Sequence, residues 1–255
     1  MRHTTDAPAQ PELNGPATGA LTPESRGVWC SVDNAVMLGA LARSAFDWIA
    51  LDAQHGEFDR RAIIDAGRVL AIAGRAFAVR VGAVNAEQIG LALDAGASTV
   101  IVPQVDTVDD ARLSVSAAHY PPMGSRSWGP LSPLRGVDAP PAADSDPQVA
   151  VMIESALSLA NVEAIAAVPG VDLLFVGPFD LSLSLGIPLD ALLTDEAGPL
   201  QRIRTAADAA GIGVGAFAGT PERARVLRAR GFDRLAVTTD TAVIAAGAQA
   251  LLAQG

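Results

Sequence analysis

The chain has 255 residues, of which 50% are hydrophobic, and it carries a formal net charge of −10 at pH 7. The apolar content excludes global disorder, and the acidic balance argues against a nucleic-acid partner, because phosphate-binding surfaces need clustered Lys and Arg. Lys and Arg together number 18, all of them Arg, and the only cysteine is Cys30. These counts exclude Lys-dependent imine, pyridoxal phosphate and P-loop chemistry, disulfides within the chain and multi-cysteine zinc sites.

The first 20 residues are mostly polar or small and show no periodicity. We therefore expect a flexible N-terminal tail over 1–20 and a single catalytic domain over 21–255. No apolar segment follows Arg2 and His3, and no run of about 18 uncharged apolar residues exists, so we expect neither a secretion signal nor a membrane span. A cytoplasmic protein without membrane contact is the expectation.

From residue 27 onward, short apolar runs rich in β-branched residues alternate with longer segments of helical spacing. Strands are predicted at 27–32, 46–52, 76–81, 98–105, 149–155, 172–178, 211–217 and 234–240. Helices are predicted at 34–44, 59–73, 85–95, 107–118, 156–167, 199–210, 221–230 and 241–252. Eight strand–helix units in a chain of this length predict an α/β fold, a single (β/α)8 TIM barrel.

A doubly wound open sheet is the alternative fold. It normally carries a Gly-rich turn after its first strand, and the SVDNAVM segment that follows the first run here is no such turn. Two long segments, 120–147 and 179–198, exceed ordinary connections, and we expect both to lie at the C-terminal face of the barrel, where active sites are built.

Charged side chains fall at the ends of predicted strands two, three, five and six, which is where barrel enzymes place catalytic groups. They are Asp52, His55, Arg80, Glu154 and Asp180. The period-2 alternation of a strand puts Arg80 and Glu154 on the inward face of their strands, so both are expected to point into the barrel mouth.

Glu154 and Asp180 are the candidate metal ligands. Two carboxylates without a Cys or His companion suit a hard divalent cation, Mg²⁺ or Mn²⁺, with Co²⁺ as a further option. The alternatives are that each carboxylate pairs with an Arg, or that Asp180 lies at the start of a helix.

His55 is a candidate general base, with Asp52 three residues earlier as the group that could orient its imidazole. Arg80 is a candidate ligand for a carboxylate or a developing oxyanion, because its donors have a fixed geometry. A structural pair of Arg80 with Asp52 is the alternative. Trp29 either lines the pocket or belongs to the core, and the turn at Gly177–Pro178 brings backbone N–H groups close to any bound anion.

The run FDWIALDAQHGEFD, followed in order by AVRV, LDAGASTVIVPQVDTVDDA, HYPPMGSRSWGP, VMIES and VDLLFVGPFDLSLSLG, resembles the HpcH/HpaI aldolase family over about residues 25–250. The resemblance implies a metal-dependent class II pyruvate aldolase on a (β/α)8 barrel. It also implies a homo-oligomer, a hexamer in which the last helix is exchanged between partners.

By the same resemblance, Glu154 and Asp180 match the metal ligands, His55 and Asp52 match an active-site pair, and Arg80 matches the Arg that contacts the oxo acid. The backbone around Gly177, Pro178 and Phe179 would hold the substrate carboxylate. Two departures concern the pocket. Met152 cannot donate the hydrogen bond of the Gln found in some members, and Phe179 is bulkier than the Ala often found at its position.

The implied reaction is cleavage or formation of 4-hydroxy-2-oxo acids, with pyruvate or hydroxypyruvate and an aldehyde as the small-molecule partners and a metal-stabilised enolate as the intermediate. Two alternatives remain. One is a metal-dependent acyl-CoA lyase of the malyl- or citramalyl-CoA type, and the other is a non-catalytic barrel that binds an oxo acid.

Overall fold

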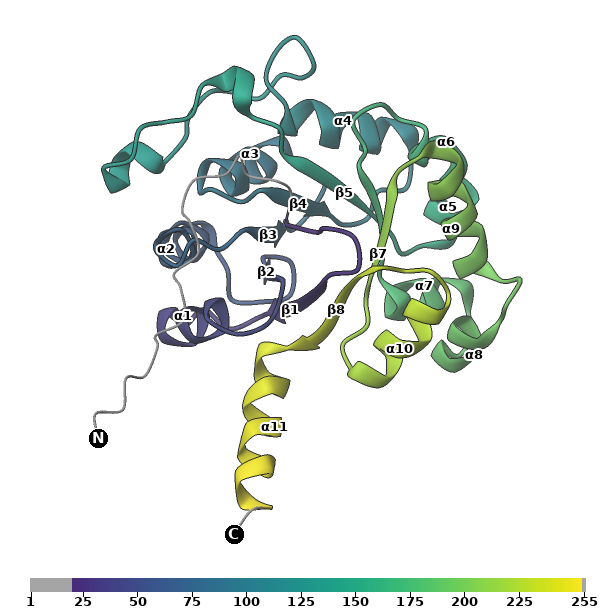
Figure 1. Ribbon diagram of the computed structural model, residues 1–255. Coiled ribbons are helices and arrows are strands. Elements are labelled where there is room, and N and C mark those ends of the chain that lie inside the picture. The colour runs from purple at the N-terminus through teal and green to yellow at the C-terminus, as the bar shows by residue number, and fades with distance from the viewer. Residues whose placement is uncertain (1–19, 254–255) are drawn as a thin grey trace, which may run out of the picture.

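A computed structural model of the chain describes residues 20–253. Within them eight parallel strands close into a barrel in sequence order, with β8 beside β1 (Figure 1). The strands are β1 (Arg26–Cys30), β2 (Trp48–Asp52), β3 (Phe77–Arg80), β4 (Thr99–Val102), β5 (Gln148–Ile153), β6 (Leu173–Val176), β7 (Gly213–Phe217) and β8 (Arg234–Thr239). The predicted (β/α)8 barrel is confirmed, and closure excludes the open sheet.

Helices cover the outside of the barrel (Figure 1). They are α1 (Ala35–Ala42), α2 (Arg60–Ile72), α3 (Ala86–Asp94), α4 (Val108–Ala118), α5 (Ala156–Ala160), α6 (Val162–Ala166), α7 (Pro178–Leu185), α8 (Leu189–Thr194), α9 (Pro199–Ala210), α10 (Pro221–Ala229) and α11 (Asp240–Leu252). Four of these helices begin after a capping side chain, which accepts a hydrogen bond from a first-turn backbone N–H; the caps are Asn34, Asn85, Thr107 and Thr220.

Two stretches differ from the predicted elements. The helix expected over 156–167 is interrupted at Asn161, which ends α5 and precedes α6. The segment 179–198, expected as a long loop, holds α7 and α8. It still begins at the C-terminal end of β6, as predicted, so the first turn of α7 lies at the barrel mouth.

The other long segment lies at the opposite end of the barrel from the position predicted for it. Residues 120–147 follow α4 and lead into β5, so they connect a helix to a strand and belong to the N-terminal face. They contain two short 3₁₀ turns, at Ser132–Arg135 and Ala142–Asp144. In Figure 1 this segment extends away from the barrel beside α3 and α4.

The barrel interior is filled by large side chains set against small ones. Trp48 and Phe175 are fully buried there, and the strands around them contribute Ala50, Ala78 and Ala150. Small inward side chains make room for the aromatic rings, so the barrel is a packed core rather than a channel. Arg80 is the last residue of β3 and Glu154 comes directly after β5, so both charged groups lie at the mouth of the barrel.

The two ends of the chain differ in how they meet the barrel. Residues 1–19 of the expected tail lie outside the described residues, while Ala20 is buried and donates its backbone N–H to Thr99. Helix α11 projects away from the barrel (Figure 1), and Asp240 is its one buried residue. None of the described helices is long and apolar enough to cross a membrane.

Candidate active site

A pocket of about 190 Å³ opens at the C-terminal ends of the strands. It brings together most of the residues predicted from the sequence, namely Trp29, Asp52, His55, Arg80, Met152, Gly177, Phe179 and Asp180. Glu154 lies beside this lining, 6% exposed, with its Oε2 against the turn at Gly177. Pro178 is buried at the first position of α7.

Asp52 and Arg80 form a buried ion pair across neighbouring strands. They are opposite each other in the β2–β3 register, and Arg80 donates Nε to Oδ1 at 2.9 Å and Nη2 to Oδ2 at 2.6 Å. This pair is the structural alternative considered for Arg80, yet the guanidinium also lines the pocket. Because Asp52 uses two of the five guanidinium N–H donors, the others remain for a substrate oxygen.

Trp29 completes this network. Its indole Nε1 donates to Asp52 Oδ2 at 3.1 Å, and the guanidinium of Arg80 lies 5.1 Å from the indole centroid. Burial alone would raise the pKa of Asp52, but the hydrogen bonds and charge of Arg80 and the bonds from Trp29 and the His55 amide hold it below its usual value. Asp52 is therefore a carboxylate at neutral pH.

His55 lies on the exposed turn after β2 and lines the pocket. Asp52 Oδ1 accepts the backbone N–H groups of Gln54 and His55, at 3.0 and 3.1 Å. The carboxylate thus fixes the backbone that carries His55. The sequence pattern suggested a bond to the imidazole, and the bonds observed for Asp52 lead to Arg80, Trp29 and this backbone instead.

Glu154 is a buried carboxylate that carries one strong hydrogen bond. Its Oε1 accepts the backbone N–H of Gln104 at 2.7 Å. Burial raises the pKa of Glu154, and the charges of Asp180 and Asp106 raise it further, while the Gln104 amide and Arg80 oppose the shift. A buried negative charge next to a second one is stabilised by a cation.

Gly177 allows Glu154 to approach the turn that carries Asp180. A Cβ at Gly177 would lie 2.8 Å from Glu154 Oε2 and 3.1 Å from Met152 Cε, closer than atoms normally pack. Asp180 follows in the first turn of α7, which was one of its two predicted alternatives. It is exposed to the pocket, whereas Glu154 and Met152 are buried.

Glu154 and Asp180 are the two carboxylates at this part of the mouth that could hold a metal ion. Within residues 20–253 no group of three or more such side chains is arranged to hold a metal ion. A cation held here would have two protein ligands and would complete its coordination with water or substrate oxygens. This is how Mg²⁺ is commonly bound.

Sequence reasoning missed several residues of this site. Ser31, Phe217 and Thr239 line the pocket, and each follows or ends a strand, so the strand-end rule could have found them. Gln104 gave no signal, because its role depends on a left-handed backbone (φ 54°) that aims its N–H at Glu154. Asp240 was missed too. Its buried Oδ2 accepts the N–H groups of Ser31 and Val32.

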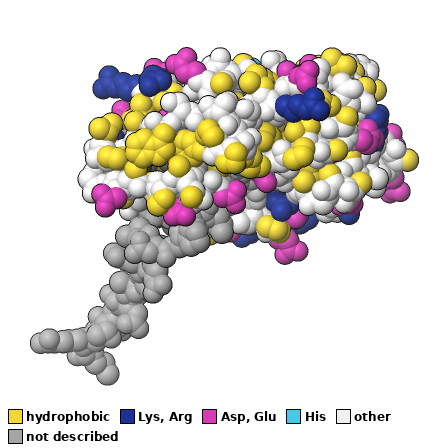
Figure 2. Space-filling view, turned by 90° about the horizontal axis from the view of Figure 1, so that it is seen from above, with side chains coloured by type: hydrophobic (Ala, Val, Ile, Leu, Met, Phe, Trp, Pro, Cys, Tyr) yellow, Lys and Arg dark blue, Asp and Glu magenta, His cyan; other side chains and the backbone are white. Residues whose placement is uncertain are grey.

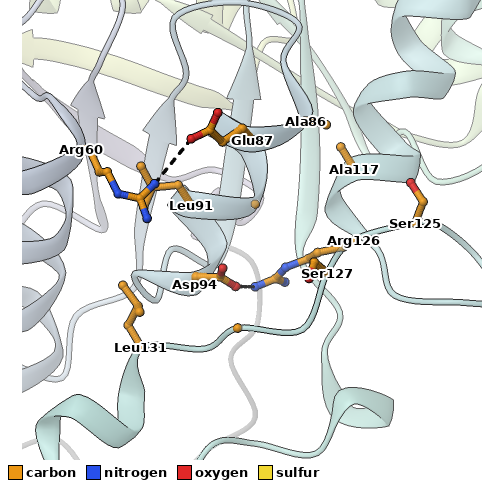
Figure 3. Close-up of a pocket in the computed structure, with 12 residues that line it drawn as sticks. Arg60, Ala86, Glu87, Leu91, Asp94, Ala117, Ser125, Arg126, Ser127 and Leu131 are labelled. Carbon is orange, nitrogen blue, oxygen red and sulfur yellow. Dashed lines mark hydrogen bonds and ion pairs between the residues drawn. The ribbon is translucent and has the colours of Figure 1, made fainter.

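A larger cavity, of about 500 Å³, lies on the outer wall between α3 and residues 125–131 (Figure 3). Its charged side chains are already in ion pairs, Arg126 with Asp94 at 2.7 Å and Arg60 with Glu87 at 3.7 Å. It lies away from the strand ends and holds no unpaired carboxylates, so size alone does not make it the catalytic site.

The fold and this mouth together define a (β/α)8-barrel enzyme with an acidic pair facing an Arg. Residues 25–246 match the HpcH/HpaI aldolase/citrate lyase family, and the chain belongs to it. The resemblance noted from the motifs is thereby confirmed.

Named relatives narrow the class further. The chain is 36% identical over 229 residues to a hydroxypyruvate/pyruvate aldolase of Rhizorhabdus wittichii, covering 88% of this chain and 91% of that one. It is 35% identical over 240 residues to a 4-hydroxy-2-oxovalerate aldolase of Rhodococcus jostii, with 89% and 90% covered. A crystal structure of an HpcH/HpaI aldolase/citrate lyase family protein from Burkholderia cenocepacia superposes with a TM-score of 0.81 at 33% identity, covering 91% of this chain and 94% of that one. The family match and these relatives put the chain among the carbon–carbon lyases.

Proposed function

We propose that the chain is a divalent-metal-dependent class II aldolase. Its reaction would be the reversible cleavage of 4-hydroxy-2-oxo acids into pyruvate or hydroxypyruvate and an aldehyde. The observation that carries this proposal is a buried carboxylate, Glu154, placed beside Asp180 and facing Arg80 across one pocket. The aldolase relatives support the reaction class.

The residues present fit a hard divalent cation. Glu154 has one backbone donor, and its burial, followed by the charge of the nearby Asp180, raises its pKa, so a cation would stabilise both negative charges. Oxygen ligands alone favour Mg²⁺ or Mn²⁺ over metals that prefer sulfur or nitrogen. Such an ion, held by Glu154 and Asp180, supplies Lewis acidity toward a keto oxygen.

Side chains and backbone groups of the protein would carry out the other steps of the proposed reaction. Arg80, held rigidly by Asp52, offers its free N–H donors to the oxygen on which negative charge develops as the C3–C4 bond breaks. The turn at Gly177–Pro178 and the backbone N–H groups that follow it in the first turn of α7 would hold the substrate carboxylate. His55 is the candidate to accept the proton of the 4-hydroxyl group, directly or through one water. Trp29 and Met152 line the pocket and would keep water away from the reacting atoms.

We further propose that the protein works as a homo-oligomer, with a hexamer expected from the resemblance. Helix α11 is rich in apolar residues, and its Ile244, Leu251 and Leu252 are 60%, 73% and 83% exposed. The face seen in Figure 2 also carries a broad apolar patch. In the 120–147 segment, Met123 and Trp128 are 55% and 58% exposed. Exposed apolar areas of this kind usually mark interfaces, and a second copy of the chain would cover them. Analytical ultracentrifugation tests this. A monomer at micromolar concentration contradicts it.

A retro-aldol screen tests the reaction. The purified protein, stripped of metal and then supplied with Mg²⁺ or Mn²⁺, is incubated with a panel of 4-hydroxy-2-oxo acids and, separately, with malyl-CoA. The expected result is metal-dependent release of pyruvate or hydroxypyruvate from the oxo acids alone. Full activity after exhaustive metal removal, or cleavage confined to the thioester, contradicts the proposal.

A further inference from the structure

One wall of the pocket at the barrel mouth is built from aromatic rings. Phe179, Phe217 and Trp29 form its wall on the side of β6, β7 and β1. Phe217 packs edge-on against Trp29, with 5.3 Å between ring centroids, and Phe179 is tilted against Phe217 at 6.4 Å. Trp29 in turn stacks on the buried Phe175 at 5.9 Å. The rings of Trp29, Phe175 and Phe217 therefore pack against one another at the barrel core.

Phe179 differs from the other rings because it is 39% exposed, on the first turn of α7. A side chain there could turn away into solvent unless something holds it. Arg223 of α10 lies over the outer face of this ring, with its guanidinium carbon 4.8 Å from the centroid. Arg223 itself does not line the pocket, so it acts on the pocket through its contact with Phe179.

Arg223 is held in this position by the loop that follows β7. Its Nη1 donates to the carbonyl of Ala218 at 2.9 Å. Gly219, the next residue, has φ +71°, and a Cβ there would lie 3.1 Å from the Phe217 ring and 3.3 Å from Arg223 Nη1. The absence of a side chain at Gly219 therefore lets the guanidinium and the Phe217 ring approach each other. Phe179 contacts both groups, with its ring centroid 4.8 Å from the guanidinium carbon of Arg223 and 6.4 Å from the ring centroid of Phe217.

We infer that Arg223 is a positioning residue which fixes Phe179 as the outer wall of the pocket and so restricts the aldehyde to short, uncharged molecules. This inference rests on the proposed aldolase function. The pocket holds about 190 Å³ for donor and acceptor together. Besides His55, the one basic side chain that lines it is Arg80, which is paired with Asp52 and offers its remaining donors to the oxo acid, while Ser31 and Thr239 offer hydroxyl groups. The wall of Phe179 and Phe217 is apolar, so a carboxylate or phosphate on the acceptor would find no partner on that wall.

The test compares aldol addition of pyruvate to three aldehydes, propanal, hexanal and succinic semialdehyde. The wild-type protein is expected to prefer propanal to both others. Phe179→Ala opens the wall and should reduce the propanal-to-hexanal ratio of kcat/KM roughly tenfold or more. Phe179→Leu, which keeps an apolar side chain in the first turn of α7, should give a smaller shift in the same direction.

Arg223→Gln should reduce the same ratio about two- to fivefold, the range of a partly exposed cation–π contact. Arg223→Lys, which keeps the cation, should restore part of the preference. Combining Arg223→Gln with Phe179→Ala should add nothing to Phe179→Ala alone, because Arg223 acts through that ring. Arg225→Gln is the matched control, since Arg225 lies on the same helix and its side chain is 74% exposed. It should leave the ratio unchanged.

Three results would overturn the inference: an unchanged ratio in Arg223→Gln, an equal loss of activity with all three aldehydes, or a loss confined to succinic semialdehyde, which would make Arg223 a direct ligand of the acceptor. Exchange of the pyruvate methyl protons with deuterated solvent, measured in the same samples, distinguishes a failure of this inference from a failure of the proposed aldolase function. Normal exchange with unaltered selectivity contradicts the role of Arg223 alone. No exchange and no addition in the wild-type protein contradict the aldolase function and this inference with it.

Discussion

The two sides of the barrel mouth satisfy their charges in different ways. On the β1–β3 side, the carboxylate of Asp52 is matched by Arg80, Trp29 and two backbone N–H groups, and its pKa is lowered. On the β4–β6 side, Glu154 has the Gln104 amide as a donor, and its burial together with the like charge of Asp180 raises its pKa.

The charge of Asp52 is therefore balanced by groups of the protein alone, whereas the charge of Glu154 is not. The Asp52–Arg80 pair is a prearranged support, which holds its donors in place before any substrate arrives. The Glu154–Asp180 pair stores repulsion that a bound cation would relieve. The same residue type, a carboxylate at a strand end, thus stabilises the protein on one side and, in the proposed function, provides a ligand for the cation on the other.

Replacing Glu154 by Gln should have the largest effect. The amide oxygen can still accept the Gln104 N–H, so the fold is kept, but the charge that holds the cation is lost. We expect kcat/KM in the retro-aldol reaction to fall by about 10³ or more, several kcal/mol of transition-state stabilisation. Without metal, the thermal midpoint should be no lower than that of the wild type, because a repulsion is removed. A variant that keeps more than a tenth of the activity would contradict the ligand role of Glu154.

Replacing Asp52 by Asn should act on stability. It leaves Arg80 buried without its counter-charge, and we expect the free energy of unfolding at pH 7 to fall by about 3 kcal/mol. Because folding lowers the pKa of Asp52, the carboxylate stabilises the fold above its unfolded pKa of about 4 and loses this effect as the pH falls through its folded value. Urea titrations should therefore show the two proteins converging below about pH 4. A constant difference down to pH 2 would contradict this assignment.

His55→Ala should slow catalysis about a hundredfold, the lower end of what general acid–base catalysis contributes, and should leave metal affinity unchanged. Steady-state rates and a Mn²⁺ titration of the same preparation check both statements. His119 offers a control, because it is buried away from the mouth at the end of α4. His119→Gln should keep the rate constant per folded molecule. An unaltered turnover in His55→Ala would remove His55 from the mechanism.

Gln104→Gly should have the smallest effect. Glycine adopts the left-handed backbone without strain and keeps the N–H that binds Glu154, so the relief of strain and the added freedom of the unfolded chain nearly cancel. We expect a stability within about 1 kcal/mol of the wild type and full activity in the same assays. A large loss of activity would show that the Gln104 side chain is used in the reaction.

The barrel could be predicted because eight apolar runs alternate with capped helical segments, and the rim residues followed from their place at strand ends. The position of 120–147 was mispredicted, although it follows the predicted helix 107–118 and therefore had to lie at the N-terminal face. Helices α7 and α8 were not among the predicted helices, since their segments carry weak helical periodicity, and a helix start at Asp180 was considered only as an alternative. The contact between Gln104 and Glu154 was invisible, because it depends on one backbone angle and a partner 50 residues away. The bonds of Asp52 could not be assigned either. An Asp three residues before a His can reach its backbone as well as its ring.

The most direct measurement is a calorimetric titration of the metal-free protein with Mn²⁺, repeated on Glu154→Gln and on Glu87→Gln as a control at an exposed carboxylate. The account predicts one Mn²⁺ ion per chain in the wild type and in Glu87→Gln, and no saturable binding in Glu154→Gln. Equal binding in all three proteins, or none in the wild type, would contradict the claim that Glu154 and Asp180 hold the ion.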